Sequence, residues 1–459
     1  MNTKKQLVAV FAAVISFGCQ TAFAQSDTSD VYIFLKDIPD AGIYLPAPPD
    51  TASLAYVDDV IQWQWGKLQR DTERGALADY DGKWGHEVVG EIYSWLLGID
   101  ISKEKTPAIW KFIKKTAYTG HLSTVLAKRK YMRTRPFAQF NEHTWSEYDN
   151  EKSLRHNGSY PSGHTSLFWT VSLAFAEMLP ELQDTIMYRA YQYSESRVIV
   201  GAHYQSDVEA GRLAASAAFA RMHTNPYYLA DLKAARAEFD KLKKLDKEDA
   251  GAWPRGECFL GQPVDTISRR FYGDVTQYWQ AKTERNTERG RQAVADADLS
   301  DEAVLNGFAS SVGIELNAKK TPAIAALVSA AKSTLLDNAK GLNSTTFRKR
   351  PFVQLGEPSL MPDSDAQASL TSSYPAEGAV VGWGLAMLLV EVAPANQNAI
   401  LTRGFEYGRS GIITGRHYAS DVQAGRLLAA AVVAHLHTNP DFLKLMDKAK
   451  AEYSKKKKK

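Results

Sequence analysis

GSYPSGHT, residues 158–165, leads directly into a mostly apolar run that ends before Pro180. The apolar side chains of 165–179 are not confined to one face of a helix, which is typical of a helix that is buried on all sides. Proline ends such a helix because its ring clashes with the preceding turn. The stretch therefore predicts a central buried helix that begins close to the Pro-Ser-Gly-His sequence.

A weakened copy of this stretch, SSYPAEGA at 372–379, precedes a second apolar run that ends at Pro394. Other segments recur as well, at an offset of 215 residues before this point and of 214 residues after it. Examples are KTPAI at 105–109 and 320–324, and HYQSDVEAGR at 203–212 with HYASDVQAGR at 417–426. A repeat of this length indicates a duplicated domain and not a solenoid of short repeats.

The pattern between the repeated segments is helical. Alanine-rich stretches follow Asp207 and Asp421, and no run alternates convincingly between polar and apolar residues. We therefore predict an all-α protein with two tandem helical bundles. The expected divisions are a signal peptide (1–24), a first domain (25–245), a second domain (246–452) and a lysine-rich tail (453–459).

The N-terminus has the pattern of an export signal. Lysines precede an apolar stretch at 7–18, and AFA at 22–24 forms a small-x-small cleavage site. We expect a mature chain that begins near residue 25 and that is periplasmic or secreted. The longest uncharged apolar runs elsewhere, such as 378–390, fall short of the ~20 residues that cross a bilayer, so stable membrane insertion is not expected.

The formal net charge of +3 comes from the two ends of the chain. Removing Lys4 and Lys5 with the signal, and setting aside the five lysines at 455–459, takes the charge to −4. A basic pI of this origin does not predict a nucleic-acid partner, and the lysine run is expected to be a disordered tail. Cleavage leaves one cysteine, Cys258, so no intrachain disulfide is expected.

Three clusters of chemically capable residues occur in the first half. They are Lys128 with Arg135-Pro136, then Pro161-Ser162-Gly163-His164, then Ser196-Arg197 with His203 and Asp207. Each cluster alone has a structural explanation, because charged residues are usually solvated and Ser-Gly after Pro often begins a helix. Their occurrence together, in this order, indicates a site for phosphoryl transfer.

The residue types fit the charges of a phosphoryl group. Lys128, Arg135 and Arg197 supply three fixed cations, and arginine can bind two phosphate oxygens at once. Ser162 and Gly163 at a helix start offer backbone N–H groups and the positive end of the helix dipole to the same anion, and glycine allows close approach.

Two histidines divide the proton transfers. Asp207, one helical turn from His203, can hold one imidazole N–H and stabilise the cation that forms, so His203 is the expected nucleophile. His164 lies at the anion cradle without a partner carboxylate in its motif, which favours a general acid that later activates water. The sequence shows no ligand spacing typical of zinc or calcium, and we expect a reaction without metal or other cofactor.

The three clusters resemble the motifs of the type 2 phosphatidic acid phosphatase superfamily, and GSYPSGHT resembles its periplasmic branch, the bacterial class A non-specific acid phosphatases. The resemblance implies the all-helical fold shared with vanadium haloperoxidases, a phosphohistidine on His203, His164 as acid and Asp207 as orienting residue. It also implies a phosphate site made of Lys128, Arg135, Ser162, Gly163 and Arg197. Small-molecule phosphate monoesters are the implied substrates, hydrolysed without metal.

The second half departs from this pattern. Asn343, Ala376, Glu377, Gly378 and Gly411 stand where the first half has Lys128, Ser162, Gly163, His164 and Arg197. A carboxylate at ~4 Å from phosphate costs about 4 kcal/mol at an effective dielectric near 20, so Glu377 disfavours phosphate binding. We predict an inactive second half in which His417 and Asp421 persist as a structural pair, and in which Arg409 or Arg416 could replace a lost charge.

Three other functions share the residues of the first half. A vanadium haloperoxidase would hold vanadate with the same cations and His203, and a lipid phosphatase would need an apolar entrance facing a membrane. A non-catalytic phosphate-binding protein is disfavoured, because binding alone needs neither His164 nor His203. The second half could instead bind a different ligand or pack on the first half as an internal pseudo-dimer, and a homo-oligomer is also compatible with the sequence.

Overall fold

The computed structural model describes residues 30–245 and 251–457, and the predicted signal peptide lies outside them. Within the described ranges the chain is helical and contains no strand, which confirms the all-α prediction. The helices in these ranges also include none with the length and apolar character that a membrane span requires.

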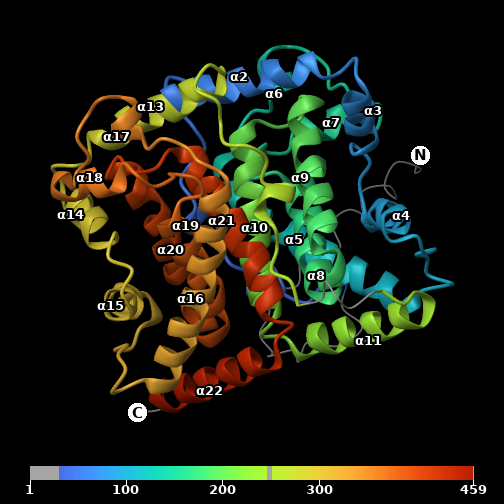
Figure 1. Ribbon diagram of the computed structural model, residues 1–459. Helices are drawn as coiled ribbons and strands as arrows, with labels where there is room; N and C mark the ends of the chain where they lie inside the picture. Colours follow the sequence, from blue (N-terminus) through green and yellow to red (C-terminus); the bar gives the residue numbers. More distant parts are fainter. Residues whose placement is uncertain (1–29, 246–250, 458–459) are drawn as a thin grey trace, which may run out of the picture.

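Two matching series of long helices make up the molecule. The first series is α2 (Leu54–Leu68), α5 (Pro107–Tyr131), α8 (Gly163–Met178), α9 (Gln183–Ile199), α10 (Gln205–Met222) and α11 (Pro226–Leu242). The second is α13 (Arg270–Lys282), α16 (Pro322–Thr345), α19 (Glu377–Val392), α20 (Gln397–Ile413), α21 (Ala419–Leu436) and α22 (Pro440–Lys457). In Figure 1 the two series lie on opposite sides of the molecule, with α10 and α21 between them, α2 and α13 along one edge, and α11 and α22 along the other.

Shorter helices complete each series. They are α1 (Ala41–Tyr44), α3 (Glu73–Tyr80), α4 (His86–Leu97), α6 (Pro136–Gln139), α7 (Glu151–Leu154) and η1 (Pro180–Leu182) in the first, and α12 (Gly256–Phe259), α14 (Glu288–Ala295), α15 (Asp301–Val312), α17 (Pro351–Gln354), η2 (Pro362–Ser364), α18 (Asp365–Ala368) and η3 (Pro394–Asn396) in the second.

Helix α8 is the predicted central helix, and all of its residues are buried. Two of its hydroxyls bond within the helix: that of Thr170 donates to the Ser166 carbonyl (2.7 Å), and that of Ser172 donates to the Phe168 carbonyl (2.8 Å). The Ser166 hydroxyl donates to the Gly120 carbonyl of α5 (2.7 Å). Because these bonds remove the cost of burying a hydroxyl, the helix can be surrounded on every side. Its counterpart α19 is buried over nearly its whole length.

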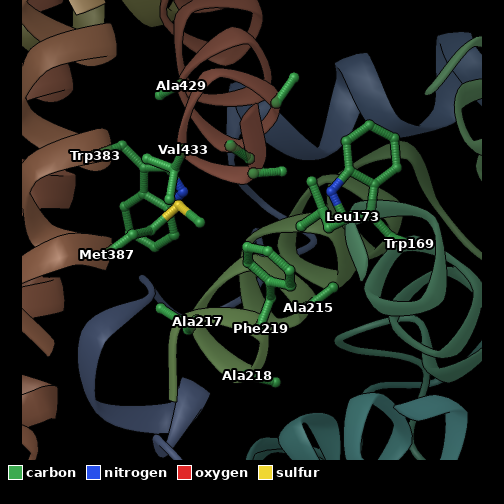
Figure 2. Packing of buried hydrophobic residues seen from close by; sticks show 14 of the residues in the cluster. Trp169, Leu173, Ala215, Ala217, Ala218, Phe219, Trp383, Met387, Ala429 and Val433 are labelled. Carbon is green, nitrogen blue, oxygen red and sulfur yellow. The ribbon is translucent and has the colours of Figure 1, made fainter. Parts of the chain in front are cut away.

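One hydrophobic core runs through both halves. Figure 2 shows Trp169 and Phe219 from the first half close to Trp383 and Val433 from the second. Alanines fill the spaces between them, at positions 215, 217 and 218 of α10 and 429 of α21. Small side chains let helix backbones approach, so the interface between the halves is packed like the interior of one domain.

Corresponding residues make the same contacts in both directions across this interface. The Gln183 side-chain amide donates to the Ala252 carbonyl (2.7 Å), and in the same way that of Gln397 donates to the Asp37 carbonyl (3.1 Å). The Arg255 N–H donates to the Asp184 side chain (2.9 Å), and in the same way the Asp40 N–H donates to the Asn398 side chain (2.9 Å). Corresponding residues of two matching bonds are 214 or 215 positions apart in the sequence, which are the offsets of the sequence repeat. Each half thus sends a segment across to the other.

The prediction of a disordered lysine run is wrong for residues 455–457. Helix α22 continues to Lys457, and Tyr453 is buried against the core. Lysine has good helix propensity, and its charge is favourable at the carboxyl end of a helix, so the run extends a helix that is already packed. Residues 458–459 lie outside the described ranges.

We expect Gly120→Ala to destabilise the contact between α5 and α8. A methyl group at Gly120 would lie 2.7 Å from Thr170 Cβ and 2.8 Å from the Ser166 carbonyl oxygen, too close for either to remain in place. The free energy of unfolding should fall by about 1–3 kcal/mol in urea denaturation. Gly341→Ala in α16, where a methyl group would meet nothing within 4 Å, should instead leave stability unchanged or raise it by up to about 1 kcal/mol.

Candidate active site

All eight residues predicted for the site lie together in the first half, and all are buried. Lys128 and Arg197 lie in the last turns of α5 and α9, and Arg135 precedes α6. Ser162, Gly163 and His164 begin α8, His203 lies in the turn after α9, and Asp207 is in the first turn of α10. Helix ends from four parts of the chain therefore converge on one point.

Backbone bonds fix the two loops that carry the histidines. The Ser162 N–H donates to the Asp207 carbonyl (2.8 Å), which ties the start of α8 to α10. The His203 N–H donates to the Arg197 carbonyl (3.1 Å), and this turn passes through Gly201 at φ +81°, a conformation that glycine adopts without strain. The positions of Ser162 and His203 thus follow from the main chain.

One ring nitrogen of His203 accepts a hydrogen bond, and the other carries the hydrogen. Its Nε2 lies 2.9 Å from Arg135 Nη1, and because a guanidinium only donates, Nε2 must be the acceptor. Nδ1 then carries the hydrogen and lies 3.4 Å from Asp207 Oδ2. Burial and the Arg135 charge hold the pKa of His203 well below its usual range, so the ring is neutral with its lone pair on Nε2.

Asp207 is held by residues that the motifs did not include. Its carboxylate accepts from Arg133 Nη1 (2.6 Å), the Ser159 hydroxyl (2.5 Å) and the Tyr204 N–H (2.9 Å). Burial alone would raise the pKa of Asp207, but Arg133 and the other donors outweigh it and keep the pKa well below its usual range. Asp207 is therefore a permanent anion behind His203.

Arg133 and Ser159 were missed because neither belongs to a motif with an obvious chemical role. Arg133 also donates to Asp59 (2.6 Å), which joins α2 to the site. Comparison of the two halves could have indicated both residues. They are retained in the second half as Arg348 and Ser373, although five of the predicted site residues are not.

His164 lies against an aromatic wall. Its Nε2 is 3.2 Å from the Gly82 carbonyl oxygen and must donate to it, which leaves Nδ1 for another partner. The Trp84 ring packs edge-on against His164 (4.6 Å between centroids) and against His121 (4.9 Å). Burial and Arg197 keep the pKa of His164 well below its usual range.

The three cations lie beside the two histidines. Lys128 Nζ donates to the Gly158 carbonyl (2.5 Å), and burial together with Arg135 lowers its pKa. Arg197 Nη2 forms a buried ion pair with Asp149 (2.6 Å), while its Nε and Nη1 have no hydrogen-bond partner among the described residues. Buried donors without partners are rare, and here they match the acceptors of an oxyanion.

The second half holds its remaining residues differently. His417 Nε2 still faces Arg350 (3.2 Å), but Nδ1 faces the Ser373 carbonyl oxygen (2.8 Å) and not a carboxylate. Asp421 is occupied by Arg348 and the Tyr418 N–H, so the predicted His417–Asp421 pair is wrong. Burial raises the pKa of Asp421 to about 6, in contrast to Asp207.

The smaller residues of the second half leave a cavity of about 300 Å³ where the first half has its site. Arg350, Glu377, Gly378, Gly411, Arg416 and His417 are among the residues that line it. Arg409 pairs with Glu284, and Arg416 Nη2 donates to the Ser364 hydroxyl (2.6 Å). Arg409 is therefore bound elsewhere, whereas Arg416 lines the cavity together with Arg350 and His417.

Comparison with known proteins identifies the family. The sequence model of the PAP2 superfamily matches residues 109–230, the segment that carries all eight site residues. A non-specific acid phosphatase of Providencia stuartii is 39% identical over 248 residues, which are 52% of this chain and 100% of the relative. This chain belongs to the PAP2 superfamily. The family resemblance inferred from the three motifs is thereby confirmed.

Other PAP2 relatives are also named for phosphatase activity. The non-specific acid phosphatase of Salmonella typhimurium is 35% identical over 50% of this chain and 91% of the relative, and the acid phosphatase of Zymomonas mobilis is 29% identical over 52% of this chain and 90% of the relative. Each alignment covers about half of this chain.

We expect Arg133→Met to disable the PAP2 site through Asp207. Two buried carboxylates, Asp59 and Asp207, would lose their shared cation, which should cost about 3–5 kcal/mol of unfolding free energy. The kcat of the folded protein should fall at least about tenfold, because Asp207 would no longer be held as an anion behind His203.

Arg348→Met is the matched control, since Arg348 joins Asp274 and Asp421 in the same way in the second half. It should cost similar stability in denaturant titrations and leave kcat unchanged. An equal fall of kcat in both variants would show that the effect is not specific to Asp207.

Proposed function

We propose that this acid phosphatase hydrolyses phosphate monoesters in its first half alone, through a phosphohistidine on His203 and without a metal ion. The observation that carries the proposal is the orientation of His203, whose Nε2 is an acceptor beside Arg135 and whose Nδ1 is directed at Asp207. Membership of the PAP2 superfamily supports the same chemistry.

In the first step Nε2 of His203 attacks phosphorus, and the bond from phosphorus to the ester oxygen breaks. Arg135 Nη1, now on Nε2, moves to a phosphoryl oxygen, which also accepts from the free donors of Arg197 and from the start of α8. The cationic phosphohistidine keeps its Nδ1 hydrogen directed at Asp207, which stabilises the positive charge. The leaving oxygen takes a proton from Nδ1 of His164.

In the second step His164, now neutral, removes a proton from water as the water oxygen attacks phosphorus. The bond between phosphorus and His203 Nε2 breaks, and inorganic phosphate leaves with His203 neutral again. His164 thereby regains the proton that it donated, and the cycle closes without any other proton carrier.

The protonation state of His164 depends on whether a negatively charged substrate is bound. In the free site burial and Arg197 lower the pKa of His164, so it is neutral near pH 7. A bound phosphoryl dianion acts in the opposite direction, because a nearby negative charge favours the imidazolium. We infer that substrate binding raises the pKa of His164 and that an acidic medium favours its charged form, which agrees with the activity for which the relatives are named.

We infer further that the chain arose by duplication and that the second half supports the first as an internal pseudo-dimer. The reciprocal contacts of Gln183 and Gln397 support this interpretation. Glu377, Gly378 and Gly411 support the absence of turnover there, because the general acid and a cation are lost. The N-terminal signal pattern supports a periplasmic or secreted enzyme.

We expect His203→Ala to abolish metal-free hydrolysis of p-nitrophenyl phosphate, because no nucleophile remains. His164→Ala should lower kcat by about 10²–10⁴, the usual contribution of general acid–base catalysis. The proteins are mixed with a monoester labelled with ³²P in its phosphoryl group and are then denatured rapidly without acid. Wild type and His164→Ala should retain an acid-labile label, and His203→Ala should not.

His417→Ala is the control, with unchanged kcat expected because the second half performs no chemistry. Loss of turnover in folded His417→Ala would refute the assignment to the first half. Halide oxidation by vanadate-loaded protein that lacks phosphatase activity would instead assign the site to a haloperoxidase.

A further inference from the structure

Four ionisable side chains meet at the interface of the two halves, far from the phosphatase site. His223 and His437 directly follow α10 and α21, and Glu177 and Glu391 lie in α8 and α19. All four are buried. The phosphatase residues lie at the opposite end of α10, whose 18 residues span about 27 Å at 1.5 Å per residue.

The two imidazole rings are fixed in one orientation. Nδ1 of His223 lies 2.9 Å from the Phe219 carbonyl oxygen, and Nδ1 of His437 lies 2.8 Å from that of Val433, so each Nδ1 donates one turn back along its helix. The ring centroids are 3.9 Å apart. Figure 2 shows Phe219 and Val433 in the core where the halves meet. Backbone bonds of this kind hold metal-ligating histidines and leave Nε2 as the ligand atom.

Each Nε2 faces a carboxylate. His223 Nε2 is 3.1 Å from Glu177, and His437 Nε2 is 2.8 Å from Glu391. With Nδ1 already the donor, a neutral ring and a carboxylate would present two acceptors to each other, so a cation must lie between them. The ligand atoms of His223, Glu391 and His437 all lie within 4.8 Å of one another.

We propose that His223, His437 and Glu391, with Glu177 as fourth ligand, bind one divalent transition-metal ion of the zinc class that joins the two halves. Two imidazoles and two carboxylates form a neutral site around a dication, and imidazole favours zinc and cobalt over calcium or magnesium. The atoms of His223, Glu391 and His437 would move toward a common centre to reach the ~2.0–2.2 Å that zinc requires, and Glu177, 3.1 Å from His223 Nε2, is the nearest further carboxylate to that ring. Each half supplies one histidine and one glutamate, so neither half alone holds the complete site.

The outer contacts of the cluster fit this role. The Tyr228 hydroxyl donates to Glu177 (3.0 Å), and Lys450 Nζ donates to Glu391 (3.1 Å), which orients both carboxylates. The spacing of these residues in the sequence, from 46 positions within a pair to 214 between histidines, gives no sign of a metal site. Only the packing of the halves assembles it.

Metal content of the purified full chain tests the proposal. Protein produced in medium supplemented with Zn²⁺ should contain about one zinc per chain by inductively coupled plasma mass spectrometry, and production with Co²⁺ should give the visible absorption of a four-coordinate site. His437→Gln and Glu391→Gln, both close to the native shape, should each lower the bound metal at least tenfold. Prolonged chelation should lower the melting temperature of wild type but not of these two variants.

His435→Gln is the matched control, because His435 is a buried histidine of the same helix that bonds to Gln183 across the interface and not to the cluster. It should retain one metal per chain. Phosphatase activity per folded molecule should stay the same in all three variants, since the cluster lies at the other end of α10, and this separates the outcome from that of the proposed mechanism.

A proton on His437 is the competing occupant. Burial lowers the pKa of His437, but the carboxylates of Glu391 and Glu177 outweigh it and raise the pKa to about 9. Wild type without stoichiometric zinc or cobalt, or with metal content equal to that of folded His437→Gln, would overturn the metal site and assign the pair to a proton.

Discussion

The buried bridge from Asp59 through Arg133 to Asp207 is the interaction on which the site in the first half depends. It converts a carboxylate that burial would neutralise into a fixed anion, and this anion sets the tautomer of His203. The same bridge ties α2, the end of α5 and the start of α10 into one unit. Without it the chain could still form its helices, but the His203 ring would have no defined orientation.

Much of this arrangement could be predicted from the sequence. The apolar run 165–179 predicted α8, and the motif spacings predicted all eight residues that converge at its N-terminus. Arg133 and the cluster around His223 could not be found in this way, because their partners lie 46 to 214 positions away and meet only after packing. The lysine run was misjudged because composition says nothing of the helix that it extends.

The two halves show how one architecture diverges through a few side chains. Arg348 and Asp421 keep the bridge, but His417 turns its Nδ1 to a main-chain carbonyl, and the pKa of Asp421 rises to about 6 where that of Asp207 falls. The helix ends that build the site are therefore retained for packing, while its charges are not. A cavity of about 300 Å³ lies beside Gly378 and Gly411, where the first half has His164 and Arg197, and the surrounding helices match those of the first half.

Because one core runs through both halves, the covalent link between them affects the stability of the fold. Partners that assemble from separate chains dissociate when they are dilute, and their stability then depends on protein concentration. Here both surfaces belong to the same chain, so the packing of α10 against α21 is intramolecular and does not depend on protein concentration. A protein built in this way keeps its fold at any dilution, and each half covers part of the core of the other.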